Sequence, residues 1–245
     1  LTTVTQDYDR TSMHGLRRSI LKEQADALGI ELVEVVLPVP CSNEQYDEAM
    51  AQAMDRAKEE GVNTVAFGDI LLEDVRAYRE ERLNSVGMKA IFPLWGEDTT
   101  DVAHQFIDLG FRARVAAFDP KTGLDPSFAG RHYDRALLAE LPQTVDPCGE
   151  RGEFHTFVYD GPLFSRPVMH EVGRLQDQGH SIFVDFVEKS RWSGLSQIEL
   201  FCIERGTLHY WKYLKEKDSN NPLIPVVRDL HSETAKEHAR RGKMA

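Results

Sequence analysis

The sequence predicts an α/β protein with a mainly parallel sheet, followed by a smaller mixed α/β lobe. The 245 residues suffice for a large core. Up to about residue 120, short apolar runs alternate with amphipathic helical stretches, as in strand–helix–strand crossovers that build parallel sheets. After about residue 121 the pattern changes to Gly- and Pro-rich loops with closely spaced β-runs. We therefore expect domains at 1–120, 121–190 and 191–245.

Periodicity and cap residues define the elements of the first part. Ser12 and Asp98 are predicted N-caps, because each precedes a stripe of apolar residues at helical spacing. The predicted order is strand 1–4, helix Ser12 to Gly29, strand 31–37, helix Asn43 to Gly61, strand 63–68, helix 73–86, strand 89–94, helix Asp98 to Gly110 and strand 111–118. Ligands of such folds bind beyond the carboxyl ends of the strands.

The second part contains a short predicted helix and several β-runs. The helix lies near 132–141, and β-runs follow at 154–160, 167–172 and 181–187. A hairpin is expected over 198–214, where Tyr210, Trp211 and Tyr213 are either an oligomer contact or core of that lobe. The polar stretch 231–245 reads as a solvated helix.

Charge and cysteine usage limit the function classes. A net charge of −11 argues against a general nucleic-acid or membrane-surface binder, since both surfaces are anionic. The three cysteines are isolated, with no CxxC pair, which favours a reducing compartment. The sequence has neither an apolar run long enough to span a bilayer nor a signal peptide at its start. We therefore expect a cytoplasmic protein.

The stretch CGERGEFHTF, residues 148–157, combines glycines, acids and a histidine ahead of an apolar strand. Gly149 and Gly152 supply backbone freedom where the acids must point. If the strand starts at Glu153, alternation puts Glu153 and His155 on one face, about 6 to 7 Å apart. Such a pair can act as acid and base or orient ammonia. The pattern alone leaves open whether this is a site or a glycine turn with solvated acids.

Other residues also allow two interpretations each. Cys148 is a nucleophile or, more in keeping with its neighbours, a small buried residue. His14 either meets an anion or adenine ring or is a polar residue at a helix start. Asp125 binds ligand or begins a turn.

The segment GDILLEDVRAYREE starts at the end of a predicted strand, where α/β folds hold a nucleotide. Gly68 and Asp69 are therefore candidates for nucleotide binding. Arg76 and Glu80 lie four apart on the following helix, a spacing that favours a surface ion pair.

Three blocks together resemble a known family: FGDILLEDVRAYREERLNSVGMKAIFPLW (67–95), LDPSFAGR (124–131) and DPCGERGEFHTFVYDGPLF (146–164). They are similar to the PP-loop ATP pyrophosphatase family that includes diphthine ammonia ligase. The resemblance extends from residue 1 to about residue 189. It implies an adenine nucleotide alpha hydrolase-like, Rossmann-like domain and an ATP-dependent amide ligase that uses Mg²⁺-ATP, a small carboxylate and ammonia. No protein-bound metal is expected.

The resemblance also implies roles for individual residues. Glu150, Glu153 and His155 would be catalytic and line the acceptor and ammonia end. The expected nucleotide-binding residues are Thr3, Met13, His14, Gly68 and Asp69. The expected substrate-binding residues are Glu80, Asp125, Gly152 and Thr156.

Two departures from the family pattern change these expectations. The phosphate-binding Ser-Gly-Gly-Lys-Asp-Ser loop is absent from the sequence, as if one strand and one helix, roughly 30 residues, preceded it. A nucleotide-binding regulatory module without catalysis is therefore the alternative function. The diphthamide-making branch has an acidic residue where this chain has His155, which implies an acceptor other than diphthine.

Overall fold

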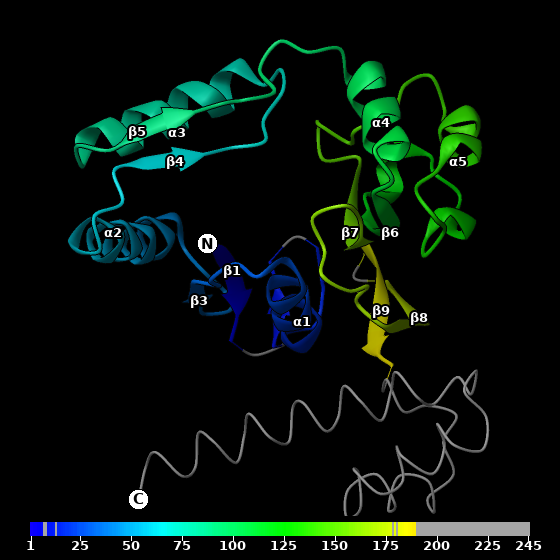
Figure 1. The fold of residues 1–245 in the computed structure, drawn as a ribbon, viewed down its shortest axis with the longest axis horizontal. Coiled ribbons are helices and arrows are strands. Elements are labelled where there is room, and N and C mark those ends of the chain that lie inside the picture. The colour runs from blue at the N-terminus through cyan, green and yellow to red at the C-terminus, as the bar shows by residue number, and fades with distance from the viewer. Residues whose placement is uncertain (7–8, 13, 178, 180, 190–245) are drawn as a thin grey trace, which may run out of the picture. The chain divides into compact units, whose positions relative to one another are not determined.

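The computed structural model describes residues 1–189 apart from 7–8, 13, 178 and 180. Its strands form three sheets, and the α/β class predicted from the sequence is confirmed (Figure 1). The predicted hairpin at 198–214 and the polar stretch after it lie outside the described residues. The elements are β1 (Thr2–Thr5), β2 (Arg10–Thr11), α1 (Arg18–Leu28), β3 (Glu34–Leu37), α2 (Asn43–Glu59), β4 (Thr64–Ala66), α3 (Glu73–Ser85), β5 (Lys89–Ile91), α4 (Thr99–Asp108), β6 (Arg112–Phe118), α5 (Arg135–Glu140), β7 (Phe154–Asp160), β8 (His170–Asp177) and β9 (Ile182–Glu188).

The first sheet has the order β2-β1-β3. β1 and β3 are parallel, with Thr2 opposite Glu34, and β2 folds back antiparallel to β1. α2 packs on β3 through a small apolar cluster. The buried members of this cluster are Val35, Leu37 and Ala53.

The second sheet consists of β4 and β5, which are parallel, with Thr64 opposite Lys89. α3 connects the two strands and packs beside them (Figure 1). The crossovers expected from the sequence therefore exist. The single, mainly parallel Rossmann-like sheet is confirmed only in part, because the parallel pairs belong to two separate sheets in the described residues.

The third sheet is antiparallel and has the order β7-β6-β9-β8. β6 was expected to end the parallel sheet, and this expectation was wrong. Ala113 and Val115 to Phe118 are all buried, so β6 is covered on both faces. A continuous apolar run indicates a strand that is buried on both faces. Such strands occur in parallel and in antiparallel sheets, so the sequence pattern does not determine the direction of pairing. The sheet joins strands on both sides of the boundary expected at residue 120.

Two apolar cores flank the antiparallel sheet. One contains residues of α4, α5 and the loop after β6, and the other contains residues of α1. Phe154 and Val158 join the first core, whereas Phe157 and Tyr159 join the second. The alternation predicted for this strand is therefore confirmed.

The N-cap residues predicted from the sequence are confirmed for some helices and not for others. The Asp98 side chain accepts hydrogen bonds from the backbone at the start of α4, as expected. Ser42 caps α2 in place of Asn43 and closes a capping box. Ser12 caps nothing, because β2 pairs with β1 at this point and delays α1 to Arg18. Within the described residues, no helix is long and apolar enough to span a membrane.

Candidate functional site

The loop between α5 and β7 is organised by two buried carboxylates, Asp146 and Glu153. Glu153 is 8 % exposed, and its oxygens accept hydrogen bonds from the backbone N–H of Asp146 (3.0 Å) and of Arg151 (2.9 Å). Asp146, 7 % exposed, accepts from the backbone N–H of Cys148 (2.8 Å) and the hydroxyl of Thr99 (2.8 Å). Both acids thus satisfy backbone donors that a tight loop leaves unpaired.

Sequence reasoning missed Asp146. The signal was present, because an Asp-Pro pair ahead of a glycine is typical of a turn whose carboxylate accepts backbone N–H groups. Gly149 and Gly152 have φ values of 67° and 82°, so the predicted backbone freedom is used at both positions.

Glu150 connects this loop to the segment between β4 and α3. Its Oε1 accepts hydrogen bonds from the backbone N–H of Ile70 (2.7 Å) and of Leu71 (3.1 Å). These donors lie just ahead of the N-terminus of α3, where backbone N–H groups lack helical partners and the helix dipole favours an anion. The contact brings Glu150 close to Gly68 and Asp69, two of the residues predicted to bind the nucleotide.

Asp69 faces Arg79 of α3. Oδ2 of Asp69 lies 3.0 Å from Nε of Arg79, and the Arg79 guanidinium lies over the ring of Phe67, 4.4 Å from its centroid. Arg79 Nη2 also donates to Asp69 Oδ1 over 3.3 Å. The two side chains therefore form an ion pair, in which Asp69 is 14 % and Arg79 37 % exposed. This pair orients the Asp69 carboxylate.

Glu80, predicted to bind substrate, forms the ion pair expected from its spacing. Arg76 Nε donates to Glu80 Oε1 over 2.9 Å. The same guanidinium lies 4.6 Å from the centroid of the Trp95 ring and 5.0 Å from that of Phe92. Glu80 is therefore coupled to an aromatic cluster at the carboxyl ends of β4 and β5.

His155 contacts His14, which sequence reasoning assigned to the other end of the site. Their ring centroids are 4.5 Å apart. Burial, and to a smaller extent the neighbouring His14, lowers the pKa of His155 to about 4. Burial also lowers the pKa of His14. Both imidazoles are thus neutral at pH 7, and each keeps a nitrogen that can accept a proton.

The segment that carries His14, residues 12–17, is held against β9 by Asp185. We call this segment the His14 loop. Asp185 accepts hydrogen bonds from Arg10 Nη2 (2.8 Å), Arg17 Nε (2.8 Å) and Arg17 Nη2 (2.7 Å). Arg10 Nη1 also donates to the carbonyl of Gly15 (2.8 Å). These bonds on both sides of His14 restrain the loop and hold His14 beside His155.

The remaining predicted residues are dispersed or have structural contacts. Thr3 is half-buried in β1, and Met13 lies outside the described residues. Asp125 caps a short 3₁₀ turn by accepting from the backbone N–H of Ser127, the turn role left open by the sequence. Gly152 is exposed, and Thr156 lies opposite Val115 in the antiparallel sheet. Their roles in binding stay predictions.

Cys148 has the environment of a structural residue. Its thiol donates to the carbonyl of Thr99 over 3.1 Å. Burial, with Asp146 and Glu150 nearby, raises the pKa of the Cys148 thiol to about 11. Because the thiolate is the reactive form, this geometry agrees with the small buried residue and not with a nucleophile.

Two local arrangements summarise the site. Glu150 joins the loop before β7 to the segment that follows Asp69, and His155 contacts the His14 loop. Glu153 closes its own loop and does not direct its oxygens to His155. In the described part of the chain, no three His, Cys, Asp or Glu side chains gather in a way that would hold a metal ion.

Comparison with known proteins shows what this region is similar to. Residues 98–183, which contain Glu150, Glu153 and His155, match the family model of the diphthamide synthase C-terminal domain. The chain is also 31 % identical over 134 residues to a diphthine–ammonia ligase of Danio rerio, covering 50 % of each chain. It is 26 % identical over 140 residues to that of Homo sapiens, covering 53 % of this chain and 50 % of the relative.

The predicted resemblance to the diphthine ammonia ligase-like family is therefore confirmed. The chain spans about half the length of these curated relatives. His14 and Asp69 lie ahead of the segment that the family model matches.

Proposed function

We propose that this protein is an ATP-dependent ligase that adenylates a carboxylate and then forms an amide with ammonia, on an acceptor other than diphthine. The main support is the contact of Glu150 with the backbone of Ile70 and Leu71. It joins the loop that matches the diphthamide synthase domain to the segment of Gly68 and Asp69. A two-step ligase requires the nucleotide and the acceptor to be adjacent in this way.

In the first step, a carboxylate oxygen of the acceptor attacks the α-phosphorus of ATP, and pyrophosphate leaves. The product is an acyl adenylate, whose AMP is a good leaving group. Mg²⁺ enters bound to the phosphates of ATP and needs only one or two protein carboxylates. Asp69, held by Arg79, is the candidate carboxylate on the nucleotide side. The protein's part is to orient the phosphates and exclude water.

In the second step, the ammonia nitrogen attacks the acyl carbon and AMP leaves. The attacking nitrogen becomes positively charged and must lose a proton. His155 is neutral at pH 7 because its pKa is lowered to about 4, so its free nitrogen can accept a hydrogen bond from ammonia and orient it. An imidazole with this pKa is a weak base, and the proton passes to the phosphate of the departing AMP. His14 restrains the ring of His155 by direct contact.

The first experiment measures AMP release by the protein with Mg²⁺, ATP and ammonia across a panel of carboxylate metabolites and elongation factor. We expect AMP release with a small carboxylate and none with elongation factor. ATP binding without AMP release on any of them would refute the ligase and favour the nucleotide-binding regulatory module.

The second experiment uses the active carboxylate to separate the two steps. His155→Ala should retain ATP–pyrophosphate exchange and lose amide formation by about a hundredfold or more. Glu153→Ala should weaken both steps, because Glu153 holds the loop that carries Glu150. His104→Ala, which changes a histidine of α4, is the matched control. Amide formation at the wild-type rate in His155→Ala would refute the assignment.

We further propose that the protein works in the cytoplasm. Within the described residues Cys41 and Cys148 are free thiols, as a reducing compartment favours. Homo-oligomer formation through residues 198–214 remains a proposal based on the sequence.

A further inference from the structure

A second polar cluster lies further along the antiparallel sheet than His155. It contains Arg114 of β6, His132 of the loop before α5, Tyr159 of β7 and His170 of β8, and we call it the Arg114 cluster. Arg114 Nε donates to His170 Nε2 over 3.0 Å, and the Tyr159 hydroxyl lies 3.1 Å from His132 Nδ1. Tyr159 lies four positions after His155 in β7, a distance of about 13 Å along an extended strand. The proposed reaction does not use the cluster.

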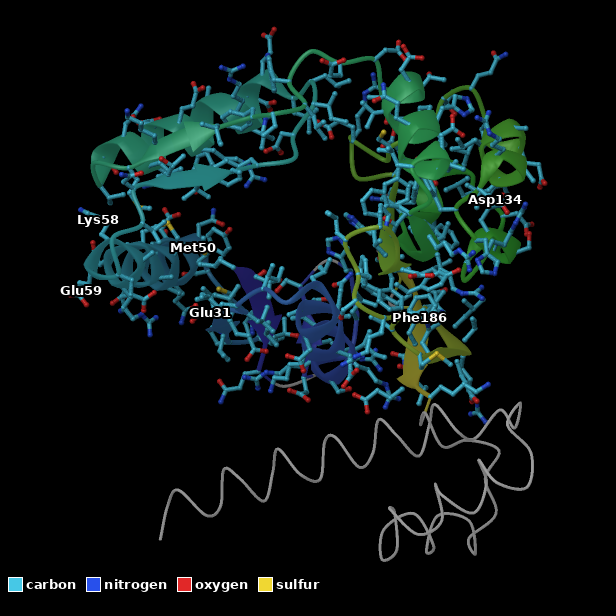
Figure 2. The ribbon with its side chains drawn as sticks, viewed as in Figure 1. Glu31, Met50, Lys58, Glu59, Asp134 and Phe186 are labelled. Atoms are coloured by element: carbon cyan, nitrogen blue, oxygen red, sulfur yellow. The ribbon has the colours of Figure 1, made fainter. Side chains whose placement is uncertain are left out.

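His170 is held in one orientation and one protonation state. Its Nδ1 lies 2.9 Å from the carbonyl of Val168, and its Nε2 receives the hydrogen bond of Arg114. The proton must therefore be on Nδ1, as inferred from these partners. The ring packs edge-on against Phe186, with centroids 5.5 Å apart (Figure 2 labels Phe186), and against Phe157 at 5.1 Å. His170 is thus a neutral acceptor that positions the guanidinium.

Arg114 differs from the other arginines in how its charge is balanced. Within the described residues, most arginines pair with a carboxylate. Those that do not are Arg56, Arg114, Arg151 and Arg174, and of these only Arg114 is not exposed. A half-buried guanidinium is usually paired with an anion, because taking a charge out of water is costly.

The hydrogen bonds of Arg114 to the described residues leave one end of its guanidinium open. Nε donates to His170, and Nη1 donates to the carbonyl of Gly130 over 2.6 Å. Neither bond uses Nη2. Two neutral acceptors therefore orient the guanidinium without neutralising it, and its remaining donors suit an anion from solution.

The histidines show the same excess of positive potential. Burial lowers the pKa of His170, the hydrogen bond to the Val168 carbonyl opposes this, and the charges of Arg114 and His132 lower the pKa by smaller amounts. Burial also lowers the pKa of His132, with Arg114 and Arg112 acting in the same direction and Asp134 opposing them. The Asp134 carboxylate accepts the backbone N–H of Leu137 at the start of α5 over 2.8 Å; Figure 2 labels Asp134.

We propose that the Arg114 cluster binds the oxyanion of a small ligand, a carboxylate or phosphate group. Arg114 supplies the charge, and the hydrogen-bonded pair of Tyr159 and His132 supplies one further donor at the solvent-exposed side. This donor is the Tyr159 hydroxyl when His132 Nδ1 donates to it, and His132 Nε2 when Tyr159 donates to Nδ1. Planar guanidinium groups match carboxylates and phosphates with two parallel hydrogen bonds. The inference goes beyond the proposed ligase function and does not depend on it, because it concerns binding alone.

The test is a titration of the full chain with sulfate and, separately, with acetate, followed by NMR of the histidine rings. Sulfate keeps its charge over the pH range in which histidines titrate. We expect saturable shifts of His132 and His170, and a raised pKa of both, because an adjacent anion favours the imidazolium form. Saturation at the lower concentration with sulfate identifies a phosphate-type ligand, and with acetate a carboxylate.

Arg114→Gln should weaken this binding about tenfold or more. Arg112→Gln, which removes an exposed arginine two residues away, should weaken it at most slightly and is the matched control. Tyr159→Phe keeps the packed ring but removes one hydrogen-bond donor, and it should weaken anion binding by a smaller factor. If Arg114→Gln fails to fold, this variant tests the proposal in its place. The proposal is overturned if wild-type histidines show no saturable shift, or if Arg112→Gln weakens binding as much as Arg114→Gln or Tyr159→Phe does.

Discussion

Replacing Asp185 with asparagine removes the negative charge that holds the His14 loop against β9. The Asp185 side chain is 13 % exposed and accepts hydrogen bonds from Arg10 and Arg17. These bonds, those of Arg17 first, lower the pKa of Asp185 from 3.8 to about 2. By linkage, such a carboxylate contributes about 2 kcal/mol to the free energy of unfolding at pH 7. We expect Asp185→Asn to lose about this amount.

The pH dependence follows from the sign of this shift. A carboxyl whose pKa is lower in the folded state stabilises the protein above its unfolded pKa, and the contribution is lost as pH falls through the folded pKa. The difference between wild type and Asp185→Asn should thus stay nearly constant down to about pH 4 and fall to about half near pH 3.

Urea unfolding monitored over this pH range measures the difference, provided that the m-values of the two proteins agree. Asp108→Asn is the control, because Asp108 pairs with Arg135 at the surface, where its side chain is 57 % exposed. Such a pair contributes less than about 1 kcal/mol. Two results would show that the contacts of Asp185 with Arg10 and Arg17 do not hold the His14 loop. One is an equal loss of unfolding free energy in Asp185→Asn and Asp108→Asn, and the other is a difference between wild type and Asp185→Asn that does not decline in acid.

Two further predictions concern the loop before β7. Gly149→Ala should destabilise the protein by about 2 to 3 kcal/mol, because φ is positive and a Cβ would lie 2.5 Å from the carbonyl oxygen of Phe154. Gly152→Ala, with open space around its Cβ, should lower the free energy of unfolding by only about 1 kcal/mol. Equal losses of stability for the two variants in thermal unfolding would contradict this. Iodoacetamide at pH 8 should label the exposed Cys41 faster than Cys148, because the pKa of the Cys148 thiol is raised to about 11. Equal labelling rates of the two cysteines, measured by mass spectrometry, would contradict a structural role for Cys148.

Local chemistry made much of the fold predictable from the sequence. Asp98 caps its helix and Gly29 ends another, because side-chain oxygens and left-handed glycines act within a few residues of their own position. The alternation of side chains between the two faces of β7 was also predictable from the sequence. The direction of β6 was not, because Val115 to Phe118 are apolar on both faces and carry no sign of which strands lie beside them.

Sequence reasoning located the loop before β7 but not the contacts that its residues make. The types and spacing of Glu150 and His155 marked the loop before the structure was known. Their partners come from distant segments, the backbone at Ile70 and the ring of His14. The expected pairing of Glu153 with His155 assumed a strand that starts at Glu153. β7 begins one residue later, at Phe154, and Glu153 accepts hydrogen bonds within its own loop.

The contacts of Asp185 with Arg10 and Arg17 also have a consequence for how the protein folds. Asp146 and Glu153 are seven residues apart, whereas Arg17 and Asp185 are separated by 168. Short loops close quickly and at little entropic cost, while pairings over such a distance must wait until the intervening chain is ordered. The loop that carries Glu150 can thus form early and locally, and the contact between His14 and His155 is assembled among the last.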